Sequence, residues 1–512
     1  MYIFKSKDIN LNYAAKICKV DEIIPIEWAS NITYAVVSNN KVVVDKDTKV
    51  GDILVYFPCE CAICPKILRE LNLYANAKLN SNYEEGKETE SVKGLFDKNG
   101  RVKMKKIRDI YSFGFAMPIS LLEQVYPDLI GNDWNMCVDM QFDVIGDSMT
   151  DDKICWKYIP EFKEPVVKPK AGSYKKAMKR LNRFDRIIPT QFRFHYDTYK
   201  LEDNVSQFRP TDNITITTKV HGASIILARV LCKKKLSIFE RFKKFIGFTV
   251  NDYEYGNVYS SRRVIKNKYI NPDATSKGNA YYSSDIYSCV NRDFSGFLSQ
   301  GMTIYGEVVG YLEGTDKYIQ KNHDYGCNVG TWKFMPYRIT TTDQLGNVTE
   351  WEIDKVYDWV YKLKTYLHLT KNPAYDKLML LDILYEGEAG KMYDNLYDSI
   401  FTNITCKDIE DFYNQRFEML KNGNIPWKYE TINNFFIDKW RTKWLESMKN
   451  DKTMLQMECD EPLCNNKVPR EGVVIRKCND KVSEAFKLKS AAHYNIERKQ
   501  HDKGETDMEE TN

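Results

Sequence analysis

The chain has 512 residues, and its 75 lysines and arginines against 71 aspartates and glutamates leave a net charge of +4. This nearly neutral balance excludes a protein that binds nucleic acid through bulk charge alone, so any basic surface must be local. The length predicts two or three domains, because one hydrophobic core seldom supports so many residues. No apolar run approaches the roughly 18 residues of a membrane span, and the first residues lack the apolar core of a signal peptide. We therefore expect a cytoplasmic protein without a membrane partner.

Residues 1–145 hold short alternating or β-branched segments between polar or glycine-containing turns, among them ITYAVVS, KVVV and DILVYF. This pattern predicts a small OB-type β-barrel. The segment RVKMKKIR within it places Arg101, Lys103 and Lys105 on one face of an expected strand. Such a strand could follow the phosphate backbone of RNA, or it could be a solvated edge strand that resists aggregation. We favour the RNA-binding interpretation.

Thirteen cysteines in a chain without an export signal predict reduced thiols. Three of them, Cys59, Cys61 and Cys64, are close enough in sequence to suggest a zinc site. Zinc would need a second pair of ligands downstream, and no further CxxC or HxxxH segment follows to supply it. The alternative is a strand that runs into a loop, with cysteines as small apolar side chains. We favour this structural interpretation.

The lysines and scattered prolines of residues 146–190 predict a solvated linker. A second β-rich region follows over residues 191–495, with expected strands at NITITTKV, SIILARV, MTIYGEVVGYL, EGVVIRK and EAFKLKS. Inside it, residues of about 350–450 have apolar side chains at helical spacing, and we expect a helical insert there. Residues 496–512 are polar enough to predict a disordered tail.

Five charged residues on the apolar strands of this second region suggest one shared pocket. Lys219 ends the strand NITITT, and Glu307 and Glu471 each lie beside a glycine in a β-branched run. Lys487 and Lys489 share one face of a strand. Neighbouring lysines repel each other unless an anion lies between them, and buried charges need partners. A polyphosphate with its divalent metals would satisfy all five residues, although none of them alone is decisive.

The same segments resemble the motifs of the covalent nucleotidyltransferases, which comprise polynucleotide ligases and mRNA capping enzymes. KVHG at 219–222 resembles motif I, YGEVVG at 305–310 motif III, EGVVIR at 471–476 motif IV and FKLK at 486–489 motif V, in the family's order. The resemblance covers about 190–495. It implies an α+β fold in which antiparallel, ATP-grasp-like sheets form a ligase adenylation domain.

Other residues narrow the resemblance to ATP-dependent RNA ligases with an OB-fold domain ahead of the catalytic domain. His221 stands where DNA ligases and capping enzymes have aspartate, and similarity extends to the segments FRFHYDTYKL, KYIQKNHDYGC, VGDILVYFP and GRVKMKKIRDIYSFGF. The sequence departs from the pattern in two respects. Ala223 and Ser224 stand where many relatives have Thr-Asn, and the helical insert separates motifs III and IV unusually far.

The resemblance implies a reaction in three phosphoryl-transfer steps, with ATP as co-substrate and Mg²⁺ or Mn²⁺ as the metal. Lys219 attacks the α-phosphate of ATP and forms lysyl-AMP, AMP passes to a 5′-phosphate RNA end, and a 3′-hydroxyl RNA end then displaces AMP. The implied partner is RNA with these two ends, a duplex-bridged break being one form of it. The enzyme is expected to be a monomer.

The resemblance also assigns roles to individual residues. Glu471 is expected to hold the metal, and nucleotide binding is expected of His195, Val220, Gly222, Arg262, Glu307, Phe334, Lys487 and Lys489. Alternatives stay open for several of these residues. Arg263 could take the place of Arg262, or both could be solvated. His195 and Phe334 could belong to the core, and Tyr337 is a second aromatic candidate for contact with adenine.

Three rival functions stay open as well. A capping-type guanylyltransferase would use GTP, but that branch has its OB domain after motif V, where only a short tail is seen here. A pseudoligase that only binds nucleic acid would have lost part of the pocket, whereas all five charged residues are kept. A DNA ligase is the nearer alternative, and His221 argues against it.

Overall fold

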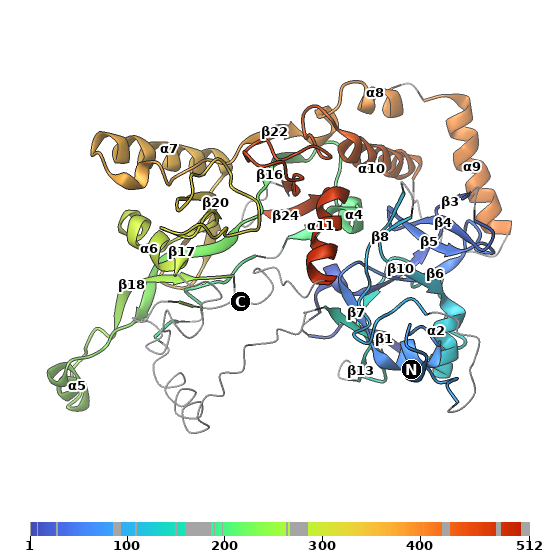
Figure 1. Ribbon diagram of the computed structural model, residues 1–512, viewed down its shortest axis with the longest axis horizontal. Coiled ribbons are helices and arrows are strands. Elements are labelled where there is room, and N and C mark those ends of the chain that lie inside the picture. The colour runs from blue at the N-terminus through green and yellow to red at the C-terminus, as the bar shows by residue number, and fades with distance from the viewer. Residues whose placement is uncertain are drawn as a thin grey trace.

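Figure 1 shows the computed structural model of the chain. The structure describes residues 2–7, 9–26, 29–84, 94–107, 110–148, 151–158, 186–188, 190–196, 198–262, 265–266, 285–402, 404–421, 431–477 and 483–502. Helices and several antiparallel sheets together make it an α+β protein, as the sequence predicts. None of the helices within these ranges is long and apolar enough to cross a membrane.

Residues 2–158 form a β-rich N-terminal unit of short strands. One sheet has the order β10 (Phe115–Pro118), β6 (Ile53–Phe57), β2 (Ala15–Lys19) and β11 (Gln141–Phe142). A meander joins β3 (Glu22–Ile24), β4 (Ile32–Val37) and β5 (Asn40–Asp45). The remaining pairs are β1 (Tyr2–Phe4) with β12 (Val144–Gly146) and β13 (Asp152–Lys153), β7 (Cys61–Ile63) with β14 (Cys155–Lys157), and β8 (Lys105–Ile107) with β9 (Ile110–Ser112). The short helices α1 (Pro65–Glu70) and α2 (Ile119–Val125) lie between strands.

The described strands of this unit do not close into a barrel, so the expected OB-type barrel is not confirmed. The physical reason is that the strands pair in several small sheets, each of which ends in edge strands. The unit also extends beyond the expected boundary at residue 145, because β13 pairs with β12 and β14 pairs with β7. Most of the expected linker lies outside the described residues.

The cysteine cluster lies inside the apolar core of the N-terminal unit. Cys59, Cys61 and Cys64 are buried, and Cys61 and Cys64 pack with Ile63, Ile67 and other apolar residues. Burial raises the pKa of the Cys61 thiol well above its ordinary value. Within the described part of the chain, none of the three belongs to a group of residues that could hold a metal ion. This environment agrees with the expected role as small apolar side chains.

Two larger sheets form the remainder of the fold. The first has the order β15 (Tyr199–Lys200), β24 (Glu484–Lys489), β23 (Gly472–Lys477), β16 (Asn213–Lys219) and β22 (Ile383–Glu388). The second has the order β18 (Tyr253–Ser260), β17 (Ala223–Lys233), β19 (Met302–Gly310), β20 (Trp332–Thr342) and β21 (Val348–Glu350). The chain passes from one sheet to the other between β16 and β17, at Val220–Gly222. This crossing is the segment with the motif I resemblance.

The helices complete the two cores. α6 (Ile286–Phe294) and α7 (Ile353–Leu369) place apolar side chains on the second sheet, while α4 (Leu201–Asn204) and α10 (Ile432–Asn450) cover the first. Trp440 and Trp444 of α10 are fully buried, and Phe208 lies between Trp444 and Phe486 of β24. The helices α8 (Leu396–Phe401) and α9 (Cys406–Lys421) lie between α7 and α10 in the chain (Figure 1). The expected helical segment therefore contributes to the core and also contains one strand, β22.

The end of the described chain differs from the expected disordered tail. Helix α11 (Ala491–Asp502) includes the first seven residues that the sequence analysis assigns to the tail. The helix is tied to the pocket because Glu497 forms an ion pair with Lys489 and His493, one turn earlier, is completely buried. Residues 503–512 lie outside the described residues.

Candidate functional site

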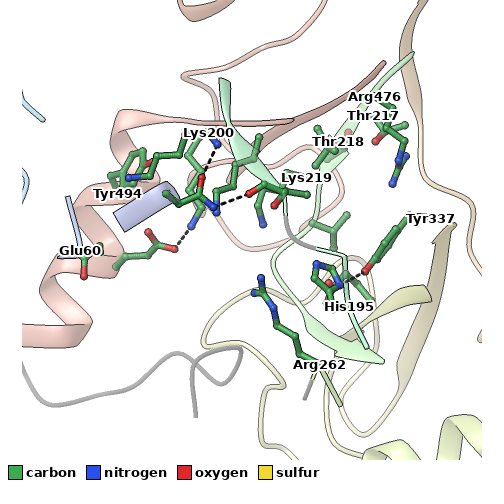
Figure 2. A pocket seen from close by; sticks show the side chains of 18 of the residues that line it. Glu60, His195, Lys200, Thr217, Thr218, Lys219, Arg262, Tyr337, Arg476 and Tyr494 are labelled. Atoms are coloured by element: carbon green, nitrogen blue, oxygen red, sulfur yellow. Dashed lines mark hydrogen bonds and ion pairs between the residues drawn. The ribbon is translucent and has the colours of Figure 1, made fainter. Parts of the chain in front are cut away.

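A pocket lies where the two large sheets meet the N-terminal unit and α11 (Figure 2). Of the residues predicted for the site, His195, Lys219, Val220, Arg262, Glu307, Lys487 and Lys489 line this pocket. They come from different strands and loops, and the tertiary structure brings them together. Glu471 lies immediately behind the pocket wall, within contact distance of Lys219.

Strand register explains why the charged residues of three motifs meet. Lys219 at the end of β16 pairs with Gly472 of β23, and Gly472 pairs on its other side with Lys489 of β24. On the second sheet, Ser224 of β17 pairs with Glu307 of β19. On the first sheet the register therefore places Lys219, Lys489 and the residue after Glu471 side by side.

Glu471 is the centre of the charge network. Its Oε1 atom lies 2.7 Å from Lys219 Nζ and 3.4 Å from Lys489 Nζ, and the carboxylate is 3% exposed. Burial alone would raise the pKa of Glu471, but Lys219 and Lys489 outweigh it and hold this pKa well below its ordinary value. Glu471 is therefore a carboxylate whose negative charge is compensated by two pocket lysines.

Hydrogen bonds fix the backbone on both sides of Glu471. The buried Arg470 donates to Thr218 Oγ1 at 2.6 Å and to the Leu455 carbonyl at 2.6 Å. Ser490 donates its backbone N–H to the Glu471 carbonyl and its hydroxyl to the Arg470 carbonyl. These hydrogen bonds fix the position of the Glu471 backbone, and with it the carboxylate beside Lys219.

Lys487 and Lys489 point to the same side of β24 but differ in their surroundings. Burial lowers the pKa of Lys487 well below its ordinary value, and Lys489, Lys219 and Arg262 add to the effect. Burial would also lower the pKa of Lys489, but Glu497 and Glu471 raise it. No hydrogen bond or ion pair joins Lys487 Nζ to the part of the chain that the structure describes. Lys487 is therefore placed to meet an anion from outside the protein.

The structure decides between the two aromatic candidates. Phe334 is completely buried in the core between β19, α6 and α7, and it does not line the pocket. Its predicted role in nucleotide binding is therefore wrong. Tyr337 lines the pocket, and its hydroxyl lies 3.1 Å from His195 Nδ1 (Figure 2). Phe334 packs in the apolar cluster that α6 and α7 cover, whereas Tyr337 packs beside Val220 and Met335, so the two aromatic side chains of β20 belong to different clusters.

Val220 and Gly222 have different roles within motif I. Val220 lines the pocket, whereas Gly222 lies behind it against β19. A Cβ atom at Gly222 would lie 2.7 Å from the Val308 carbonyl oxygen, so only glycine allows this close approach. The structure therefore gives Gly222 a packing role, in contrast to the nucleotide contact that the sequence predicts.

Arg262 lies two residues after the end of β18 and extends into the pocket (Figure 2). It adds a cation to the group formed by Lys219, Lys487 and Lys489. Arg263, the open alternative, lies outside the described residues. Arg476 of β23 also lines the pocket, and burial together with Arg338 lowers its pKa to about 10.

Two histidines join Glu471 as possible metal ligands. His221 Nδ1 lies 3.8 Å from Glu471 Oε2, and His493 Nε2 lies 3.8 Å from Glu471 Oε1. All three side chains are buried, and their ligand atoms lie within 4.8 Å of one another. The neighbouring His323 is neutral, because burial and His221 lower its pKa to about 3. Two imidazoles and a carboxylate are a donor set that suits Mn²⁺ or another transition metal, and Glu471 Oε2 accepts no hydrogen bond from the described residues.

Several pocket residues escaped the sequence analysis. His493, Tyr494 and Glu497 come from α11, and Glu60 and Lys157 come from the N-terminal unit. Lys200 joins the two parts, since its backbone N–H donates to Asn12 Oδ1 at 2.8 Å and its Nζ donates to the Cys59 carbonyl. The one sequence signal available was the four-residue spacing of His493 and Glu497, which places both on one helix face.

The predicted RNA-binding strand is only partly correct in structure. Arg101 is 3% exposed and makes two hydrogen bonds to Glu60, at 2.8 and 2.9 Å. Its predicted role as an RNA contact is therefore wrong, because a buried and paired guanidinium is not available to phosphate. Strand β8 begins only at Lys105, which is exposed, and Lys103 lies 3.3 Å from Asp97. RNA binding by these two lysines stays a prediction.

Comparison with known proteins supports the fold. No protein-family model and no curated protein matches the chain. Among solved structures, an RNA ligase of Naegleria gruberi is similar over nearly its whole length. A ligand-free mutant has 15% identity and a TM-score of 0.50, with 94% of this chain and 98% of that one covered. A mutant with ATP and Mn also has 15% identity and a TM-score of 0.50, with 96% and 99% covered. The chain therefore has the fold of RNA ligase structures.

Proposed function

We propose that this protein is an ATP-dependent RNA ligase that joins a 3′-hydroxyl end to a 5′-phosphate end. The observation that carries the proposal is the convergence of Lys219, Arg262, Lys487 and Lys489 beside Glu307 and Glu471 in one pocket. A lone strand-end lysine has many explanations, but a nucleophile surrounded by cations on separate strands fits a nucleoside triphosphate. Similarity to RNA ligase structures supports the same conclusion.

In the first step the Lys219 amine forms a bond to the α-phosphorus of ATP, and the bond to pyrophosphate breaks. The Lys219 ammonium is paired with Glu471, so the amine becomes a nucleophile only after it has lost its proton. Nearby cations disfavour the ammonium form and so favour this loss. Lys487 and Lys489 offset the charge on the phosphate oxygens, and Arg262 contributes from the opposite sheet.

In the second step AMP leaves the Lys219 nitrogen for the 5′-phosphate of RNA. In the third step the 3′-hydroxyl attacks that phosphate, a phosphodiester forms, and AMP departs. Mg²⁺ or Mn²⁺ would be held by Glu471, with His221 and His493 beside it. Such an ion would supply positive charge against the phosphate oxygens.

The two sides of the pocket suggest how the nucleotide is oriented. Tyr337 and His195 form a hydrogen-bonded pair on one side, and Val220, Leu381 and Val474 add apolar surface. This side fits the adenosine, with Glu307 placed for the ribose. The lysines on the other side fit the phosphates, which in turn places the α-phosphate beside Lys219.

The N-terminal unit is proposed as the part that binds RNA, in the position of an OB-type domain. It lies against the pocket through Asn12, Cys59 and Glu60, so an RNA end held there would reach Lys219. The same proposal includes the cellular setting and the substrate. The enzyme acts as a monomer in the cytoplasm, and its RNA substrate is a break bridged by a duplex.

The test is covalent labelling of the protein with ATP that carries its label at the α-phosphate. With Mg²⁺ or Mn²⁺, acid-labile label should stay on the protein through a denaturing gel, and Lys219→Ala should carry none. Label from GTP alone would instead indicate a capping enzyme. Substrates that differ only in ribose or deoxyribose at the 3′ strand's last nucleotides then separate RNA from DNA ligation, because only the 2′-hydroxyl differs.

A further inference from the structure

A short helix at the tip of a long hairpin lies apart from the rest of the molecule (Figure 1). Strands β17 and β18 form the hairpin, and their pairing continues out to Lys233 and Tyr253. Helix α5 (Ile238–Phe245) lies between them, and Ser237 and Glu240 form a capping box at its start. The capping box satisfies backbone N–H groups at the start of the helix, so local residues are sufficient to define where the helix begins.

One face of α5 is apolar and exposed. Its residues follow the spacing i, i+1, i+4, i+7 and i+8, which places them on one side of a helix. The exposed fractions are 87% for Ile238, 65% for Phe239, 58% for Phe242, 87% for Phe245 and 50% for Ile246, and Phe248 just beyond is 63% exposed. No residue of α5 is buried. Contiguous aromatic surface of this kind marks an interaction site rather than a solvated helix.

The surroundings of this apolar face are basic. Residues 233–254 contain six lysines and arginines and three acidic residues. Each acidic residue already has a basic partner: Glu240 lies 2.6 Å from Lys234 Nζ, Asp252 pairs with Lys244, and Glu254 pairs with Arg186. Among the residues that the structure describes, these pairs leave Lys233, Lys235, Arg241 and Lys243 as positive charge without an acidic partner around the phenylalanines.

We propose that residues 233–250, here called the hairpin tip, bind the surface of an anionic phospholipid membrane. The four phenylalanines and two isoleucines would enter the boundary between headgroups and acyl chains, and the basic residues would lie at the phosphates. A protruding convex tip fits a soft, flat surface without a matching groove. A peripheral contact of this kind needs no membrane-spanning helix.

The same features disfavour a nucleic-acid partner. Aromatic side chains on nucleic-acid surfaces stack singly on bases, with basic groups aligned along the backbone. In α5 the apolar residues form one continuous face that includes aliphatic side chains, and the basic residues lie around it. The hairpin tip shares no residue with the pocket, so the proposal does not depend on the proposed function.

The experiment is flotation of the purified full chain with two kinds of vesicle. One is pure phosphatidylcholine, and the other contains one-third phosphatidylserine. The wild type should float with the anionic vesicles, less so at high salt, and weakly with the neutral ones. Phe242→Ser with Phe245→Ser should lower the partition coefficient at least about tenfold, because two phenylalanine side chains no longer leave water.

A matched control carries Leu345→Ser with Leu369→Ser, which are 84% and 76% exposed elsewhere on the surface. This variant should float like the wild type, and both double variants should melt like it, since all four positions are exposed. Wild-type protein that stays unbound to anionic vesicles at low salt would overturn the proposal. Two other results would also overturn it. The phenylalanine variant could lose RNA binding while its flotation is unchanged, which would indicate a nucleic-acid partner. It could instead lose a self-associated form in ultracentrifugation while its flotation is unchanged, which would indicate a second copy of the chain.

Discussion

Lys219 and the buried Glu471 form an ion pair, with 2.7 Å between Nζ and Oε1, although 252 positions separate them in the chain. Their strands are neighbours, and Lys219 pairs in register with Gly472, the residue after Glu471. The pair therefore places the buried carboxylate of Glu471 against the proposed nucleophile. This contact gives the first prediction.

Glu471→Gln should destabilise the protein by about 3 kcal/mol at neutral pH, because Lys219 and Lys489 each lose a buried carboxylate partner, although Lys489 keeps Glu497. The pKa of Glu471 is lowered in the folded state from its ordinary value of 4.5. The stabilisation is therefore fully present above pH 4.5 and is lost as the pH falls below it. Thermal melting of both proteins from pH 8 to pH 4 measures this. The gap in melting temperature should be constant above pH 5 and narrow below 4.5, and a gap that widens there would contradict the assignment.

The two lysines of β24 should respond in opposite directions. Burial lowers the pKa of Lys487 below 10.5, so its charge costs stability at neutral pH, and Lys487→Met should raise the stability of the ligand-free protein by about 1 kcal/mol. Lys489→Met should lower it, because Glu497 and Glu471 lose a partner. Melting without nucleotide compares the two variants. Both should lose the stabilisation that ATP and Mg²⁺ give the wild type, and an intact ATP effect in Lys487→Met would refute its phosphate role.

Removal of His493 tests the proposed metal site. If its imidazole binds the ion beside Glu471, then His493→Ala should weaken Mn²⁺ binding by about 10- to 100-fold in the presence of a non-hydrolysable ATP analogue. Titration followed by electron paramagnetic resonance of free Mn²⁺ measures the affinity directly. His368→Ala, on the exposed face of α7, is the matched control. Equal affinity in all three proteins would show that His493 only packs against the pocket.

Substitutions of the two aromatic residues of β20 should have different effects: at Phe334 on stability, and at Tyr337 on nucleotide binding. Phe334→Ala should cost about 3–5 kcal/mol of stability, because it opens a cavity in a fully buried core. Tyr337→Phe should melt nearly normally but raise the KM for ATP in the labelling reaction, since it loses the hydrogen bond to His195. Denaturation and labelling kinetics give both readings. A selective rise in KM in soluble Phe334→Ala, without loss of stability, would reverse the assignment.

The basic residues before β9 should also separate into one that stabilises the fold, Arg101, and two that bind RNA, Lys103 and Lys105. Lys103→Ala with Lys105→Ala should reduce the salt slope of RNA binding by about 2, because each lysine would neutralise one phosphate. Arg101→Ala should instead lower stability, since the half-buried Glu60 carboxylate loses its two hydrogen bonds from the buried guanidinium. Point substitutions are preferable to deletion of the N-terminal unit, which supplies Asn12 and Cys59 to the pocket. An unchanged salt slope would remove these lysines from the proposed RNA surface.

The sequence alone determined the features that depend on short-range geometry. Alternation along a strand has period two in any fold, so Lys487 and Lys489 had to share a face opposite Phe486 and Leu488. The structure confirms this, with both apolar residues fully buried. Similarly, glycine and charge in an otherwise apolar strand marked Glu307 and Glu471 before any partner was known.

Only the tertiary structure decided which face of a strand meets the pocket. A register shift places Pro336 opposite Gly306 and Arg338 opposite Tyr305, so alternation is broken at Tyr337 and its side could not be inferred from that of Phe334. Arg101 likewise looked like a surface cation until Glu60, 41 positions away, was placed beside it. The four-residue spacing of His493 and Glu497 indicates one helix face, but only the tertiary structure shows that α11 returns to the pocket, because charge pairing rather than an apolar pattern accompanies their burial. Sequence periodicity reflects only the local backbone geometry, whereas the partners of a buried charge come from distant parts of the chain and depend on the tertiary structure.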